Sequence, residues 1–104
     1  YFAEYSQVPP EQRAAMLFAA ARILQRRKSE FNAWLILEAG KNWNEAEADT
    51  AEAIDFCDYY ARQMLRYAAP EALVQMPGEH GKLVYLPLGV GIIIPPWNLS
   101  LIHI

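Results

Sequence analysis

The segment that most constrains the fold is an apolar run near the C-terminal end, Leu86 to Asn98, with the sequence LPLGVGIIIPPWN. Its centre, Val90 to Ile94, holds three consecutive isoleucines. Such β-branched runs are typical of strands covered on both faces, as in parallel sheets. Pro95 and Pro96 should end the strand, because proline cannot donate a ladder hydrogen bond. Since open α/β sheets bind ligands at the carboxyl ends of their strands, the run predicts a buried strand followed by a binding turn.

Three helices are expected upstream of this strand. The first segment is rich in Ala, Leu, Gln and Arg, which favour helix, and its apolar residues recur at helical spacing. Gly40 is typical of a left-handed C-cap at the end of the second helix. We expect the helices to span Pro10–Arg27, Ser29–Ala39 and Asn44–Tyr67.

The N-terminal caps of the later helices can also be read from the sequence. Ser29 is the expected N-cap of the second helix. Two capping boxes compete for the start of the third helix, Asn44 with Glu47 and Asn42 with Glu45. The sequence leaves that choice open.

A second strand is expected just before the apolar run. Lys82 to Leu86 reads KLVYL, and the corner at Pro87 to Gly89 would lead into the strand at Val90–Ile94. The expected fold class is therefore α/β, with three helices followed by a β-hairpin that carries the first strand of a sheet.

Composition and charge narrow the class of protein. A formal net charge of -3 over 104 residues gives no basic patch for nucleic acid. No apolar stretch reaches the roughly 20 residues of a transmembrane helix. The single cysteine, Cys57, cannot form an internal disulfide, which favours an intracellular setting. We therefore expect a cytoplasmic protein without a transmembrane segment.

Two motifs, which lie one after the other along the chain, carry a family resemblance. The later motif, PLGVGIIIPPWN, is similar to the start of the dinucleotide-binding domain of aldehyde dehydrogenases. The earlier motif, GKNWNEAEADTAEAIDFCDYYARQML, resembles the Δ1-pyrroline-5-carboxylate (L-glutamate γ-semialdehyde) dehydrogenase branch of that family. The likeness extends from Pro10 to Asn98, and it implies that residues 1–98 are part of an NAD-binding domain with NAD as cofactor.

The resemblance implies roles for the residues that end the apolar run. Ile94, Pro95, Pro96 and Trp97 would line the nicotinamide-ribose end of the NAD site, although the prolines also serve to end the strand. Asn98 would help to stabilise the oxyanion formed from the aldehyde, beside the backbone N–H of a cysteine nucleophile. Read from the residues alone, Asn98 is either a helix cap or a hydrogen-bond donor to a ligand.

Two residues of the third helix are implied as substrate contacts. Glutamate semialdehyde carries an ammonium group, and the resemblance makes Glu52 its anionic partner. Phe56 would shape the aldehyde tunnel. On the residues alone, Glu52 could equally belong to a carboxylate-rich surface that faces water.

Cys57 is not the expected nucleophile. The family's catalytic cysteine lies far downstream of Ile104, and a cysteine within a helix is more often a small buried hydrophobe. Asp55 and Asp58 should raise its pKa rather than lower it. No metal site is expected, because the histidines lack neighbouring ligands.

The implied activity is oxidation of L-glutamate γ-semialdehyde to glutamate in proline catabolism. The full-length protein would be a homo-oligomer, fused to or paired with proline dehydrogenase. This chain would be an inactive piece of it, since nucleophile and general base are both absent. Two alternatives stay open: another semialdehyde dehydrogenase, which would not need Glu52, and a helical packing module without catalysis.

Residues 99–104 stand apart from the rest. The family would usually continue with Phe-Pro after Asn98, whereas Leu99 to Ile104 reads LSLIHI. That hexapeptide matches the translation of a transposon end used in preparing sequencing libraries. We expect a non-native tail here, with simple divergence as the alternative.

Overall fold

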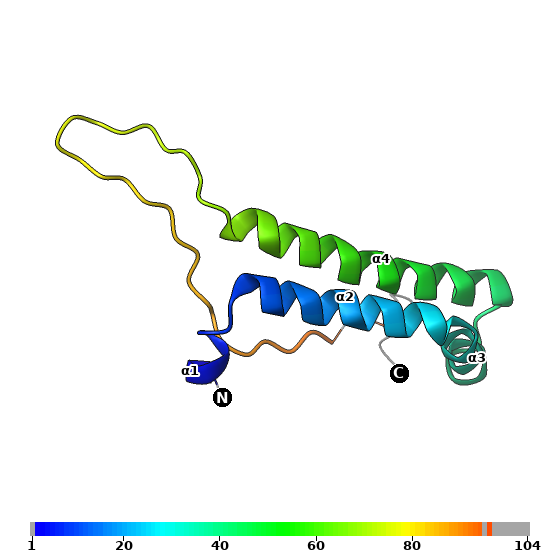
Figure 1. The fold of residues 1–104 in the computed structure, drawn as a ribbon. Helices are drawn as coiled ribbons and strands as arrows, with labels where there is room; N and C mark the ends of the chain where they lie inside the picture. The colour runs from blue at the N-terminus through cyan, green and yellow to red at the C-terminus, as the bar shows by residue number, and fades with distance from the viewer. Residues whose placement is uncertain (1, 95, 97–104) are drawn as a thin grey trace.

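The computed structural model describes residues 2–94 and 96, which form helices joined by turns and extended segments (Figure 1). The helices span Phe2–Tyr5 (α1), Pro10–Arg26 (α2), Lys28–Ala39 (α3) and Trp43–Ala68 (α4). Helices α2 and α4 lie side by side in opposite directions, and α3 crosses at one end of the pair. The three helices expected from the sequence are present, and their ends lie within one residue of the expected positions.

Small side chains form the contact between the two long helices. Ala14 and Ala21 of α2 are buried, as are Ala46 and Ala61 of α4. Because the distance between packed helices depends on the side chains at the contact, alanines allow the two backbones to approach closely. Leu35 of α3, 1% exposed, is the largest fully buried side chain. The core is therefore narrow, and many large apolar side chains lie on other faces.

The ends of α3 and α4 are set by short-range hydrogen bonding. The N–H of Glu45 donates to Asn42 Oδ1 at 3.0 Å, and the N–H of Asn42 donates to Glu45 Oε2 at 3.2 Å. Of the two possible capping boxes, α4 uses this one. Gly40 ends α3 with φ 67°, which confirms the expected left-handed C-cap. The expected N-cap at Ser29 is wrong: α2 and α3 are separated by one residue, so Ser29 already lies within the helix.

The expectation of an α/β fold with a β-hairpin is wrong for the part of the chain that the structure describes. Residues 82–86 and 90–94 lie outside regular secondary structure, and no strand occurs among the described residues. A strand needs a neighbour to pair its backbone N–H and C=O groups, and a lone hairpin is at best marginal in water. Val90 and Ile92 are 90% and 83% exposed, so apolar burial does not compensate. The β-branched residues favour a strand, but no described segment supplies the second strand with which they would pair.

A β-turn beyond α4 returns the chain to the helices (Figure 1). The N–H of Glu79 donates to the C=O of Met76 at 3.0 Å, and Gly78 has φ 84°, as a type II turn requires. The returning segment places the ring of Tyr85 5.2 Å from that of Tyr67, between centroids. Residues 82–86 therefore lie against the C-terminal end of α4, although they form no strand.

Candidate functional site

One face of α4 carries both residues that were expected to contact substrate. Glu52, Phe56 and Tyr60 are spaced four apart, so they follow one another along one side of the helix. Glu52 lies on the opposite side of the helix from the buried Ala61, about 180° around the axis. Phe56 and Tyr60 are 46% and 57% exposed, and their ring centroids lie 6.0 Å apart. We call Asp49, Glu52, Phe56 and Tyr60 the Glu52 face.

Tyr60 was missed by the sequence reading. The signal was present, because aromatic residues at positions 56 and 60 have the spacing of neighbours on a helix surface. Tyr60 also lines a cavity of about 780 Å³ between α2, α4 and the returning segment, together with Leu17, Tyr67 and Leu83. The Glu52 face thus leads from an exposed carboxylate to an aromatic pair at the edge of a cavity.

Glu52 differs from most other acidic residues of α4 in having no partner among the described residues. Four acids of this helix are paired: Glu45 with the Asn42 backbone, Glu47 with Lys28 and Asn32, Asp49 with Lys41, and Asp58 with Arg62. Glu52 is exposed and forms no hydrogen bond or ion pair with the residues described. On its face of α4, it is therefore the carboxylate available to a cationic ligand.

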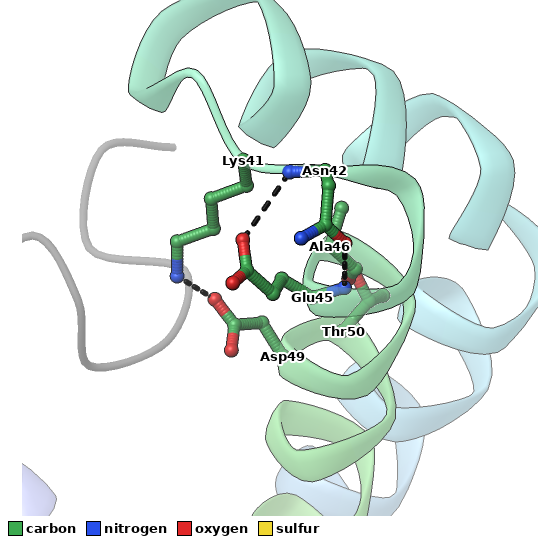
Figure 2. Close-up of polar contacts among 6 residues, drawn as sticks. All are labelled: Lys41, Asn42, Glu45, Ala46, Asp49 and Thr50. Atoms are coloured by element: carbon green, nitrogen blue, oxygen red, sulfur yellow. Dashed lines mark hydrogen bonds and ion pairs between the residues drawn. The ribbon is translucent and has the colours of Figure 1, made fainter.

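A nearly buried ion pair lies one helical turn before Glu52 (Figure 2). The side chain of Lys41 reaches from the turn between α3 and α4 to the carboxylate of Asp49, and the two side chains are 6% and 17% exposed. Beside them, the Asn42–Glu45 capping box stabilises the same turn between α3 and α4. The sequence reading missed this pair, because a turn separates the two residues and no helical spacing relates them.

A second ion pair joins α3 to α4 on another side of α4. Lys28 donates to Glu47, and Asn32 Nδ2 donates to the other carboxylate oxygen at 2.6 Å. The hydrogen bond from Lys28, followed by that from Asn32, lowers the pKa of Glu47. At 100° per residue, Glu47 lies about 160° around the helix from Asp49, so this cluster is remote from the Glu52 face.

Only two of the four expected NAD-binding residues, Ile94 and Pro96, lie within the described part of the chain. Ile94 is 88% exposed, Pro96 is exposed, and neither lines the cavity beside Tyr60. Pro95, Trp97 and Asn98 lie outside the described residues. The role of all four residues in a cofactor site therefore stays a prediction.

Cys57 does not have the environment of a nucleophile. It is half-buried, and burial raises the pKa of its thiol. The pKa of Cys57 is raised, as expected, but the cause is burial of the thiol and not the charges of Asp55 and Asp58. Within residues 2–94 and 96, no group of three acidic, histidine or cysteine side chains could hold a metal ion. None of the helices described is both long and apolar enough to cross a membrane.

Comparison with known proteins identifies the family. The pattern of the aldehyde dehydrogenase family matches residues 1–104. The chain belongs to the aldehyde dehydrogenase family. Members of this aldehyde dehydrogenase family generally use NAD(P) as cofactor.

Among aldehyde dehydrogenases, similar relatives are named 1-pyrroline-5-carboxylate dehydrogenase. The protein of Geobacillus thermodenitrificans (strain NG80-2) is 56% identical over 97 residues, which is 93% of this chain and 19% of the relative. The 1-pyrroline-5-carboxylate dehydrogenase 2 of Bacillus subtilis (strain 168) gives the same figures. The 1-pyrroline-5-carboxylate dehydrogenase 1 of Halalkalibacterium halodurans is 52% identical over 100 residues, or 96% of the chain and 19% of the relative. The expected branch is confirmed, and the chain spans about a fifth of these relatives' length.

Proposed function

We propose that the whole protein to which this chain belongs oxidises L-glutamate γ-semialdehyde to glutamate. The observation that carries the proposal is the exposed Glu52 carboxylate, unpaired among the described residues and one turn from the aromatic Phe56. The names of the 56% identical relatives support the same substrate.

Substrate chemistry explains why this pair of residues would suit the role. Glutamate semialdehyde has an aldehyde at one end and an ammonium and a carboxylate at the other. Glu52 would pair with the ammonium, which simple aliphatic aldehydes lack. Phe56 would contact the methylene groups between the two ends, where an apolar side chain excludes water. Recognition therefore belongs to α4, apart from the reacting carbonyl.

Asn98 is proposed as a hydrogen-bond donor to the oxyanion that develops on the aldehyde oxygen. It lies outside the described residues, and its support is the PPWN motif in a member of the aldehyde dehydrogenase family. One such donor is worth roughly 3–4 kcal/mol of barrier. Cys57 would not be the nucleophile, because its burial disfavours the thiolate. The chain on its own should be inactive.

The remaining parts of the proposal concern the whole protein. We propose NAD as the cofactor, with Ile94, Pro95, Pro96 and Trp97 contributing to its site once the rest of the protein encloses them. The support is the family's general use of NAD(P). We also propose a cytoplasmic homo-oligomer that acts in proline catabolism, fused to or paired with proline dehydrogenase.

The test separates recognition from chemistry in the full-length protein. Asn98→Ala should lower kcat about 100-fold on both glutamate semialdehyde and propanal, because the oxyanion forms with either substrate. Glu52→Gln should raise KM for glutamate semialdehyde alone. Asp55→Asn, which also removes an exposed acid from α4, controls for general charge effects. Equal losses on both substrates in Glu52→Gln would contradict the proposed substrate.

A further inference from the structure

The ion pair between Lys41 and Asp49 places a cation close to the carboxylate proposed to bind substrate. Lys41 is 8% exposed, and its ammonium is held by Asp49 (Figure 2). Asp49 precedes Glu52 by three residues, so the two carboxylates are neighbours on the α4 surface, roughly 5–6 Å apart at Cβ. A lysine ammonium on its flexible four-carbon stem could reach either of them.

We propose that Asp49 is a specificity-determining positioning residue that holds Lys41 away from Glu52. With Asp49 ionised, the Lys41 charge is already compensated, and Glu52 stays available to the ammonium of the substrate. Without that charge, a poorly exposed lysine would be left unpaired, which is costly. Glu45 lies in the same corner but already accepts a hydrogen bond from the Asn42 N–H. The lysine would then turn to Glu52, the neighbouring carboxylate without a partner among the described residues, and compete with the substrate. This inference rests on the proposed function.

Other contacts already define the corner where this pair lies. The capping box of Asn42 and Glu45 fixes the start of α4, and the left-handed Gly40 fixes the end of α3. Lys28 and Glu47 link the same two helices on another side. Since the turn has these independent supports, loss of the Asp49 charge should affect substrate selectivity more than the fold.

The test uses charge removal and rescue in the full-length protein, with KM measured for glutamate semialdehyde and for propanal. Asp49→Asn should raise KM for glutamate semialdehyde about three- to tenfold, the scale of one competing ion pair, and leave propanal unchanged. Asp49→Asn combined with Lys41→Met should restore the semialdehyde KM, because no cation remains to occupy Glu52. A purely structural role predicts that Asp49→Asn raises KM for both substrates, because a distorted turn would also disturb the binding of propanal. A loss on both substrates, or failure of the rescue, would overturn the inference.

Three further variants serve as controls for the effect of Asp49→Asn. Glu47→Gln removes the acid of the other α3–α4 ion pair and should leave the ratio of the two KM values unchanged. If Asp49→Asn does not fold, Lys41→Met alone decides: the inference expects no increase in the semialdehyde KM, and a selective increase overturns it. Glu52→Gln distinguishes a failure of the proposed function from a failure of the role of Asp49. If it has no selective effect, the proposed function fails. If it has one while Asp49→Asn has none, only the role of Asp49 fails.

Discussion

Gly40 ends α3 in a conformation that other residues rarely adopt, with φ 67°. A Cβ added there would meet no atom within 4 Å, so the penalty for alanine is conformational rather than steric crowding by neighbours. We predict that Gly40→Ala lowers the free energy of unfolding by about 1 kcal/mol. Thermal unfolding followed by circular dichroism measures this change.

Gly91 provides the control for Gly40. A Cβ at Gly91 also meets no atom within 4 Å, but its φ is not in the left-handed region. Gly91→Ala should leave the thermal midpoint unchanged or slightly higher, because alanine restricts the unfolded chain. Equal effects of the two substitutions would contradict the conformational explanation.

Cys57 is predicted to matter for packing and not for turnover. Its thiol is half-buried and its pKa is raised by that burial, so little thiolate exists at neutral pH. In the full-length protein, Cys57→Ala should retain nearly all of kcat on propanal and cost about 1 kcal/mol of stability. An inactive variant with an unchanged thermal midpoint would show that the thiol takes part in the chemistry.

At the scale of elements, α4 depends on the capping box at its start. Asn42→Ala should lower the stability of the chain by about 1 kcal/mol, because it leaves the N–H of Glu45 without its side-chain acceptor. Asn44→Ala is the matched control, since Asn44 belongs to the alternative box that the structure does not use. Thermal unfolding should separate the two variants, and a larger loss in Asn44→Ala would favour the other box.

The link between α3 and α4 through Glu47 should weaken in acid. Hydrogen bonds from Lys28 and Asn32 lower the folded-state pKa of Glu47 below its unfolded value. The link therefore stabilises the fold fully above the unfolded pKa of about 4.3, and this stability is lost as pH falls through the folded pKa. We predict that Glu47→Gln loses less stability than the wild-type chain between about pH 7 and about pH 3. Lys28→Met should likewise reduce the loss of stability in acid. If the stability of wild type and of Glu47→Gln falls in parallel with pH, the acid sensitivity does not come from Glu47.

The whole molecule is elongated, with extents of 63 × 27 × 24 Å and a radius of gyration of 18.3 Å. A compact chain of this length has a radius of gyration near 13 Å. The loop that follows α4 projects beyond the helix pair and contributes to the difference (Figure 1). The segment from Val90 to Ile94 has returned toward the helices but packs poorly, because its apolar side chains are 83–90% exposed. An exposed apolar run with unpaired backbone groups is a site of association.

We predict that the 104-residue chain associates as its concentration rises and that this segment is responsible. Replacing Ile92 and Ile94 together by Gln should weaken association without changing the thermal midpoint, because both side chains are exposed. Leu37→Gln, at a 77% exposed position on α3, is the control and should have little effect. Sedimentation velocity over a concentration series measures this, and unchanged association in the double variant would contradict the prediction.

Local chemistry was sufficient to predict the helices and part of the candidate site. The left-handed C-cap at Gly40 and the helical spacing of α2 depend on residues within one or two turns. Glu52 and Phe56 were expected to act together, and their spacing of four places them on one face whatever else the chain does. The sequence also predicted two possible capping boxes for α4, and the structure shows that Asn42, not Asn44, is the N-cap.

Tertiary structure decided the features that depend on distant partners. Lys41 meets Asp49 across a turn, and Lys28 meets Glu47 from another helix, so neither pair could be found from spacing. The run from Val90 to Ile94 has the composition of a strand but forms none in the described residues. The physical reason is that a helix satisfies its backbone hydrogen bonds within its own segment, whereas a strand or an ion pair exists only when the fold supplies a second group at the right distance.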